Sequence, residues 1–409
     1  MKRVLSFVLI TILAVSMINC VSAFAESSQD EVVWVRFAGP MADAQKVILN
    51  DYPNGKATID DLAYMSLQSK ISLALMANQS EYDIVQLNQD WVKEYASEGY
   101  LEPLDDLLNE AGVDLSGYNE GLLDIFSYEG KIYALPEFAQ CYYFAFNTDW
   151  LAQDGLEVPE SWDDFFEVCE YYKNNGSGLA IPGFFSTYAN EMYATFLYSY
   201  GGKWYDEDTG ELTLDTEAGL KAFELWQKLF EVAVEDNASL SVDDVCQLLR
   251  EGSVPVALTI SGLSCDDFDP EKSVISDCVA YRKLYFDDLK CCVSSFGVAI
   301  PKNCKDVDAS LRFITWLTSA EIENRESLES GSISGRVDEV SAEVNEKYPY
   351  IAVAQDALSN PVFPLNAGEG LNVMEDLSLI LQKLHMEEGY SPEDAVRELS
   401  EKYAGVDLR

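Results

Sequence analysis

Residues 130–149 have the sequence GKIYALPEFAQCYYFAFNTD, an apolar and aromatic run with Pro136 near its middle. Proline has no N–H group to donate to a neighbouring strand, so it is confined to strand edges, strand starts and bulges. The apolar run nevertheless resumes after the proline as CYYFAFN, residues 141–147. The pattern therefore predicts two strands that are separated at Pro136.

Segments with the character of strands and helices alternate around this stretch. Residues 32–37 (VVWVRF) and 82–87 (YDIVQL) predict strands, and residues 61–79 between them have the apolar spacing of a helix. Such alternation is typical of α/β proteins with parallel strands. Further predicted elements are strands at 254–261 and 294–301, helices that follow Ser161, Thr216 and Ser391, and helices near residues 190–200, 308–319 and 372–386.

The charge balance limits the partners that this chain can have. Of its 409 residues 71 are acidic and 27 basic, which gives a formal net charge of −44. Nucleic acids and anionic membrane surfaces are bound through clustered Lys and Arg, so the balance argues against both. The hydrophobic fraction of 48% allows substantial cores, and the length favours two or more domains.

The N-terminus has the features of a secretion signal. A basic start precedes an apolar segment and the small residues of the triplet Ala23-Phe24-Ala25. We expect cleavage after Ala25, which makes residues 1–25 a signal peptide and the mature protein extracellular or periplasmic. The alternative is cleavage before Cys20, which would leave a lipid-anchored cysteine.

The chain has nine cysteines, one of them Cys20 in the signal region. In an exported protein the remaining even number permits disulfides, but eight cysteines allow 105 pairings and the sequence selects none of them. Cys291 and Cys292 are adjacent, so we expect their side chains to point apart. Free, buried thiols are the alternative to disulfides.

The sequence offers little for catalysis. Its single histidine, His385, lies in a predicted amphipathic helix, and Gly-x-Ser-x-Gly, His-Glu-x-x-His and Walker motifs are absent. We therefore predict no catalytic residue, no metal site and no cofactor. A secreted, glycan-active enzyme with paired carboxylates stays open as an alternative, because 71 acidic residues bring some together by chance.

Aromatic residues are a more specific signal. The chain has 7 Trp, 23 Tyr and 19 Phe. The C–H face of a sugar ring lies flat on an aromatic ring, while carboxylates and amides bind its hydroxyl groups, so a carbohydrate site interleaves the two kinds of residue. Residues 86–91 (QLNQDW) and 137–140 (EFAQ) supply that mixture after predicted strands, where α/β folds bind ligands.

Seven segments, in order along the chain, resemble the extracellular solute-binding proteins of family 1. These form the sugar-binding, maltose-binding-protein-like group, the capture components of ABC importers. The most specific segment is residues 130–165, in which a Gly-Lys-x-Tyr-x-x-Pro run, an aromatic strand ending in Asn and a Pro-x-x-Trp helix start follow one another. The other segments are residues 82–108, 201–223, 250–262, 296–303, 311–319 and 331–338.

The resemblance implies a two-lobed periplasmic-binding-protein fold of type II. Each lobe is expected to be a mainly parallel sheet flanked by helices, with a hinge between the lobes. The first lobe would contain residues 26–136 and about 293–335, and the second residues 137–292 and about 336–409. Pro136 would then end one strand at the crossing between lobes, and residues 141–147 would belong to the second lobe.

Positions that match the family's ligand-contacting segments give the candidate binding residues. Asp90 matches a position that binds sugar hydroxyl groups, Trp91 lies beside it, and Gln140 stands where a Glu is usual. The full set is Phe37, Asp90, Trp91, Glu137, Gln140, Tyr188, Glu191, Trp204, Ser261 and Arg336. For Arg336 two roles stay open, a ligand contact or an ion pair that holds the last crossing.

The function implied by the resemblance is capture of a small-molecule carbohydrate. The protein, expected to be a monomer, would close its lobes on the ligand and pass it to the membrane permease subunits of an ABC importer. An alternative keeps the fold and changes the ligand to a cationic or amino-acid-derived solute, such as a polyamine, because the chain is so acidic.

Overall fold

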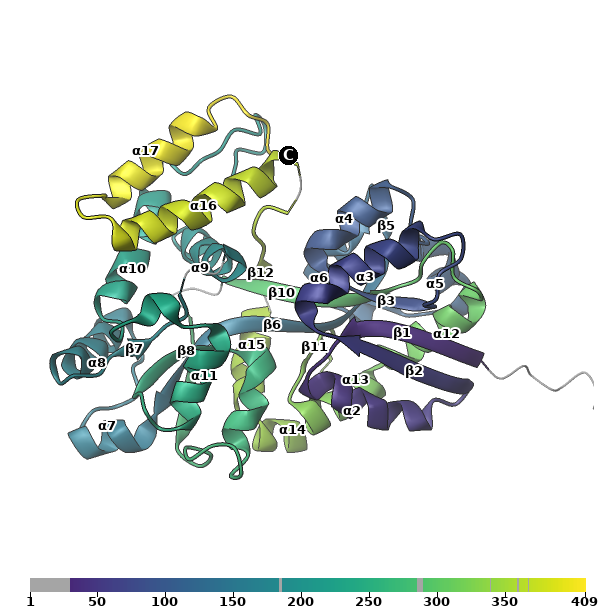
Figure 1. The fold of residues 1–409 in the computed structure, drawn as a ribbon, viewed down its shortest axis with the longest axis horizontal. Helices are drawn as coiled ribbons and strands as arrows, with labels where there is room; N and C mark the ends of the chain where they lie inside the picture. Colours follow the sequence, from purple (N-terminus) through teal and green to yellow (C-terminus); the bar gives the residue numbers. More distant parts are fainter. Residues whose placement is uncertain (1–29, 184–185, 285–289, 339, 359, 367) are drawn as a thin grey trace, which may run out of the picture.

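The computed structural model describes residues 30–183, 186–284, 290–338, 340–358, 360–366 and 368–409. The predicted signal peptide and Cys20 lie outside the described residues. Long strands cross the middle of the molecule and join a group of helices on one side to another group on the opposite side (Figure 1). No helix among the described residues is long and apolar enough to span a bilayer.

One large mixed sheet organises the chain. Its strands are β1 (Asp30–Phe37), β2 (Gly55–Leu62), β3 (Ile84–Asn88), β6 (Ala134–Asn147), β7 (Leu179–Ala180), β8 (Val256–Ile260), β9 (Val279–Lys283), β10 (Cys291–Ala299), β11 (Ile333–Ser334) and β12 (Pro361–Val362). The order is β2-β1-β3-β10-β6-β8-β7, with β9 and β11 paired to β6 and β12 paired to β10. A separate hairpin is formed by β4 (Ser127–Tyr128) and β5 (Lys131–Ile132).

The direction of several strands differs from the expected one. β1, β2 and β3 are parallel, as expected for strands that are connected by helices. β10 runs antiparallel to β3 and β6, and β6 runs antiparallel to β8. The sheet is therefore mixed, whereas the resemblance implied mainly parallel sheets. The predicted strands at 32–37, 82–87, 254–261 and 294–301 are confirmed as β1, β3, β8 and β10.

β6 runs through Pro136 without interruption, so the prediction of two separate strands is wrong. In its ladder with β10, Phe138 lies opposite Phe296 and Pro136 lies opposite Gly297. Glu137 is thus an extra residue on β6, a β-bulge. A bulge leaves some ladder positions unpaired and so tolerates a residue without an N–H group. One continuous strand serves both halves of the molecule.

Helices gather at the two ends of these crossing strands (Figure 1). Those beside β1, β2 and β3, which we call the first lobe, are α2 (Pro40–Ile48), α3 (Tyr64–Met76), α4 (Gln89–Ser97), α5 (Asp105–Ala111), α6 (Glu120–Ile125), α12 (Val307–Leu317) and α13 (Ala320–Ser330), with the 3-10 turns η1 (Leu49–Asp51) and η2 (Leu115–Gly117).

The other helices form what we call the second lobe, with β7, β8 and β9. They are α7 (Thr148–Asp154), α8 (Trp162–Asn174), α9 (Ser186–Ser199), α10 (Glu217–Glu231), α11 (Val242–Arg250), α14 (Ala342–Lys347), α15 (Tyr350–Leu358), α16 (Glu369–Met386) and α17 (Pro392–Lys402), with the 3-10 turns η3 (Asn237–Ser239) and η4 (Ser261–Phe268). The division of the chain between lobes at 136, 293 and 335 stays a prediction.

Side-chain caps fix the starts of three predicted helices. The hydroxyl groups of Ser161, Thr216 and Ser391 each accept a hydrogen bond of 3.2 Å from the backbone N–H three residues ahead. Such a cap satisfies one of the N–H groups that the first turn leaves without a partner. The predicted starts of α8, α10 and α17 are therefore confirmed.

Each lobe has its own core against the sheet. In the first lobe Trp34 packs edge-on against Phe313, with ring centroids 5.9 Å apart. In the second lobe Phe144 packs against Phe165, at 4.3 Å. All cysteines among the described residues are free thiols. With two cores and a shared pair of strands, the region between the lobes is the place where a ligand can be enclosed.

Candidate functional site

A cavity of about 280 Å³ lies where the two lobes meet the crossing strands. Its walls come from the end of β1 and the starts of α2 and α3 in the first lobe, from β6 and β10, and from α9 and η4 in the second lobe. The lining residues are Phe37, Ala38, Gly39, Pro40, Met41, Tyr64, Asn88, Phe138, Gln140, Tyr142, Glu191, Gly262, Leu263, Ser294 and Phe296. Because both lobes contribute, a movement of one lobe relative to the other would change its size.

Aromatic rings form one wall of the cavity. Phe138 of β6 and Phe296 of β10 are stacked, with centroids 5.0 Å apart and planes at 7°. Phe37 packs against Phe296 at 5.0 Å. Tyr64, the first residue of α3, extends the wall and stacks on Trp91 at 6.0 Å. A continuous aromatic face of this kind suits the apolar face of a ring-shaped ligand.

Amide and hydroxyl groups supply the polar groups of the lining. Asn88 caps α4 by accepting a hydrogen bond of 2.9 Å from the Asp90 N–H, and its Nδ2 donates to the Tyr64 hydroxyl at 3.4 Å. Gln140 of β6 and Ser294 of β10 also line the cavity. A few convergent polar groups in a mostly apolar pocket are what orients a small ligand.

Two carboxyl groups lie at this site. Glu191 of α9 lines the cavity and is 3% exposed. Burial raises the pKa of Glu191 to about 8, and the negative charge of Asp90 adds to the shift. Hydrogen bonds from Tyr142 and Ser294 oppose it. Burial also raises the pKa of Asp90 to about 6, against the attraction of Lys93. At neutral pH Glu191 is therefore mostly protonated and Asp90 mostly ionised.

The bulge residue Glu137 belongs to a buried network. Its carboxylate accepts hydrogen bonds from Arg36 Nη1 at 3.0 Å, Gln86 Nε2 at 2.6 Å and Gln45 Nε2 at 2.8 Å. Gln45 also donates to Glu326 at 2.8 Å. These contacts join β1, β3, β6, α2 and α13 in the first lobe, so Glu137 holds the end of the crossing strand to that lobe.

Six of the predicted site residues lie in or beside the cavity. Phe37, Gln140 and Glu191 line it. Trp91 and Tyr188 are one step behind the lining, each packed against a ring that belongs to it. Asp90 acts on Glu191 through its charge.

The other predicted residues do not line the cavity. Trp204 is 2% exposed in the core of the second lobe. Trp204 Nε1 donates to the Phe363 carbonyl at 3.1 Å. Ser261 is buried, and its Oγ accepts a hydrogen bond of 3.2 Å from the Cys141 N–H. These contacts show that both residues pack in the core. Neither residue touches the cavity, so their predicted role in binding has no direct contact to support it.

The surroundings of Arg336 favour the ion-pair alternative. Its Nε is paired with Asp338, and its guanidinium carbon lies 4.5 Å from the centroid of the Tyr118 ring. Its Nη1 donates to the Thr318 carbonyl at 3.2 Å. Arg336 therefore ties the chain that follows β11 to the first lobe.

Several lining residues were not predicted. Asn88 and Phe138 lie inside the two segments that combine aromatic and polar residues, so the signal for both was present in the sequence. Tyr142 and Phe296 had the pattern of strand residues only. Tyr64 had no signal, because its place at the site depends on how α3 is packed across β1.

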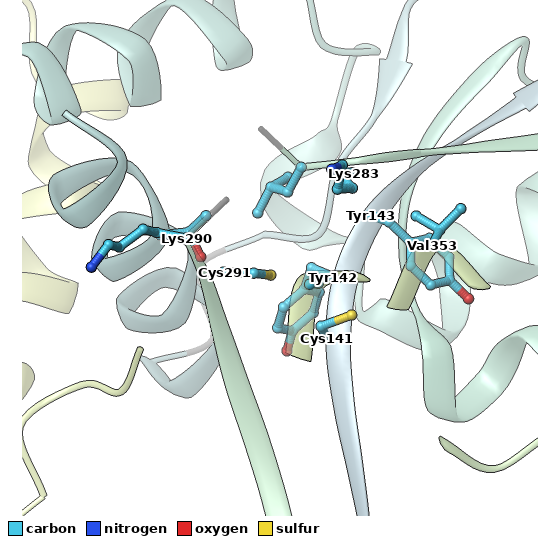
Figure 2. Close-up of a pocket in the computed structure, with 10 residues that line it drawn as sticks. Cys141, Tyr142, Tyr143, Lys283, Lys290, Cys291 and Val353 are labelled. Atoms are coloured by element: carbon cyan, nitrogen blue, oxygen red, sulfur yellow. The ribbon is translucent and has the colours of Figure 1, made fainter. Parts of the chain in front are cut away.

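A second hollow lies between β6, β10 and α15 (Figure 2). Its lining includes Cys141, Tyr143, Cys291 and Val353. Its volume is about 10 Å³, which is room for about one water molecule. It is too small to hold a solute. Two hollows of about 420 and 430 Å³ are each lined by residues of the second lobe alone, so the cavity between the lobes is the candidate site.

Comparisons with known proteins agree with this arrangement. A family model described as bacterial extracellular solute-binding protein matches residues 37–324. The chain is 23% identical over 282 residues to a probable amino-acid ABC transporter periplasmic-binding protein of Sinorhizobium fredii, over 66% of this chain and 64% of that protein. It is 22% identical over 262 residues to a maltotriose-binding protein of Pyrococcus abyssi, over 62% of this chain and 54% of that one. The matched region thus spans between about half and two thirds of these relatives.

The fold is similar to that of a solved structure, the maltose-bound MalE3 of T. maritima. The TM-score is 0.78 at 17% sequence identity, over 91% of this chain and 98% of the other. At that identity the likeness concerns the fold. It confirms the expected two-lobed α/β architecture.

Proposed function

The chain belongs to the bacterial extracellular solute-binding proteins, and we propose that it captures a small carbohydrate between its lobes and delivers it to the permease of an ABC importer. The observation that carries the proposal is the cavity of about 280 Å³ with an aromatic wall and polar side chains. Small-molecule pockets have volumes of roughly 300–1,000 Å³, so this one suits a small solute better than a long oligosaccharide.

The lining has the chemistry that a sugar requires. The stacked pair Phe138 and Phe296, extended by Phe37, offers a face for the C–H groups of a sugar ring. Asn88 and Gln140 can donate to and accept from hydroxyl groups at the ring edge. The similar proteins support a carbohydrate ligand, since one is named for maltotriose and the structural neighbour holds maltose.

Capture would occur by closure of the lobes about the strands that join them. β6 and β10 run through both lobes, so bending of these two strands would narrow the cavity around a ligand. We infer that the closed form is what the permease subunits recognise. We infer that residues 1–25 are removed and the mature protein is exported, since capture of a solute for an importer takes place outside the cytoplasm.

We propose binding without turnover. His385 lies on α16 with its ring 4.8 Å from that of Phe230, outside the cavity lining. The carboxyl group in the lining, Glu191, lies close enough to Asp90 for their charges to interact, and a glycosidase alternative would use such a pair of carboxyl groups. Incubation with a panel of glycans separates the two ideas, because an enzyme releases product and a binding protein returns its ligand unchanged.

A ligand screen tests the function itself. A ligand that binds only the folded state raises the melting temperature. We expect one or more mono- or disaccharides to raise it, in a screen that also contains amino acids, polyamines and peptides. Stabilisation by amino acids or by polyamines, with none by any carbohydrate, would contradict the proposal.

Replacing Tyr64 by alanine should weaken carbohydrate binding by roughly 1–3 kcal/mol, the scale of a lost stacking contact. Tyr64 is 44% exposed, so its removal should leave the melting temperature of the free protein nearly unchanged. Calorimetric titration measures the affinity, with Tyr171→Ala, an exposed tyrosine on α8, as the matched control. Equal affinities for Tyr64→Ala and wild type would remove Tyr64 from the site.

A further inference from the structure

The cavity contains a buried carboxyl group for which the described residues provide no matching cation. Glu191 is 3% exposed and lines the cavity. Neither Glu191 nor Asp90 takes part in any ion pair formed by the described residues, and no positive charge acts on Glu191 among them. Lys93 acts on Asp90, but its ammonium group donates to Asn366 at 3.0 Å.

Some other buried acids of the described chain form an ion pair with an arginine. Glu137 is paired with Arg36 at 3.0 Å, and Asp267 with Arg250 at 2.8 Å. A buried carboxyl group can ionise at little cost only beside such a partner, because removing the water around a carboxylate is unfavourable unless another charge or several hydrogen bonds replace it. Asp83, Glu323 and Glu326 are also buried and take part in no ion pair among the described residues, but only Glu191 lines the ligand cavity.

Asp90, the second carboxyl group, has a free acceptor. Its Oδ1 is fully buried and has no hydrogen-bond partner among the described residues. A buried acceptor without a donor is unfavourable and is rare in folded proteins. Asp90 does not line the cavity, so it acts there through its negative charge beside Glu191.

Aromatic rings surround the same place. Tyr64 and Tyr142 both line the cavity, and Glu191, when ionised, raises the pKa of both hydroxyl groups. Ring faces attract a cation that lies within about 6 Å of the centroid. A carboxyl group together with aromatic rings is the combination that binds an ammonium group.

We propose that the carbohydrate captured by this protein is an amino sugar, whose protonated amine lies beside Glu191 among the rings of Tyr64 and Tyr142. The inference rests on the proposed function and narrows its ligand class. The ammonium group stabilises the ionised form of Glu191, while the hydroxyl groups of the sugar bind the amides and its ring face lies on the phenylalanine wall.

Binding of the ammonium should release a proton. The titratable groups that influence Glu191 or are influenced by it are Asp90 of α4, Tyr64 of α3, Tyr142 of β6 and Cys292 of β10. Burial raises the pKa of the last three, so they stay protonated at pH 6.5. Glu191, with its pKa near 8, also holds its proton in the free protein. A neighbouring ammonium favours the carboxylate, and the proton leaves to solvent.

Calorimetric titration at pH 6.5 tests this with sugars that differ only at one substituent. Glucosamine is compared with glucose and N-acetylglucosamine, and galactosamine with galactose and N-acetylgalactosamine. We expect at least one amine to bind ten-fold or more tightly than both of its neutral counterparts. In buffers of different ionisation enthalpy, the measured enthalpy should show release of a proton for the amine alone.

Glu191→Gln keeps the size of the side chain and removes its charge. It should lose both the preference for the amine and the proton release, whereas Glu224→Gln, an exposed glutamate on α10, should keep both. Equal or tighter binding of the neutral sugars by the wild type would overturn the inference and leave the proposed function intact. Absence of binding by every sugar, amino or neutral, would contradict the proposed function and with it this inference.

Discussion

Replacing Glu137 by alanine will lower the free energy of unfolding by about 3–5 kcal/mol, because it leaves a buried charge without its partner. Arg36 is 0% exposed, and its Nη1 lies 3.0 Å from the Glu137 carboxylate. Gln86 and Gln45 lose an acceptor at the same time. Equilibrium unfolding in urea measures the change.

Two comparisons isolate the cause. Glu207→Ala breaks an exposed ion pair with Lys203 and should change stability by less than about 1 kcal/mol. The double variant Arg36→Met with Glu137→Leu replaces the pair by apolar side chains and should recover much of the loss. A loss for Glu137→Ala as small as that for Glu207→Ala would show that the network does not hold the crossing strand.

Replacing Glu191 by glutamine will stabilise the free protein at pH 8 by roughly 3–5 kcal/mol and reduce the dependence of its stability on pH. The pKa of Glu191 is about 8 in the folded protein and 4.5 when unperturbed. Above pH 4.5 the unfolded chain releases the proton that the folded protein keeps. Stability is therefore full below pH 4.5 and falls as the pH rises to about 8, by about 1.36 kcal/mol for each pH unit between the two pKa values.

Asp90 acts in the same direction over a lower range. Its pKa of about 6 is raised from 3.8, so it lowers stability as the pH rises between these values, in wild type and variant alike. Urea unfolding at pH 5, 6, 7 and 8 should therefore give curves for wild type and Glu191→Gln that diverge with rising pH. Glu224→Gln should follow the wild type. Parallel curves for wild type and Glu191→Gln would show that Glu191 is ionised without penalty.

The sequence predicted those features that depend on neighbouring residues. The predicted caps at Ser161, Thr216 and Ser391 are confirmed, because each cap satisfies an N–H group of its own helix and depends on no distant residue. The alternation of strands and helices, and the order of the family's segments, were sufficient for the two-lobed fold. Phe37 and Gln140 were predicted as binding residues from the end of one strand and the crossing segment, and both line the cavity.

The features that were missed depend on residues far apart in the chain. Pro136 lies in a bulge because it faces Gly297, which is distant in sequence. Trp204 was expected at the ligand, but it lies in the core of the second lobe, and its ring nitrogen donates to the Phe363 carbonyl. Tyr64 reaches the cavity only through the packing of α3. In each case the position of the residue depends on a tertiary contact, which a local sequence pattern does not predict.

A cavity-blocking variant tests the central claim, that a carbohydrate binds between the lobes. Gly262 is exposed at the cavity, and a Cβ there would meet only the end of the flexible Gln140 side chain, at 2.5 Å from its Oε1. Gly262→Trp should therefore fold normally and fill the cavity. Leu379→Trp, at an exposed position on α16, is the matched control.

The measurement is calorimetric titration of the three proteins with the carbohydrate that most raises the melting temperature of the wild type. We predict saturable binding by wild type and Leu379→Trp, and binding at least ten-fold weaker by Gly262→Trp at an unchanged melting temperature. Wild-type affinity in Gly262→Trp would place the ligand elsewhere and contradict the account.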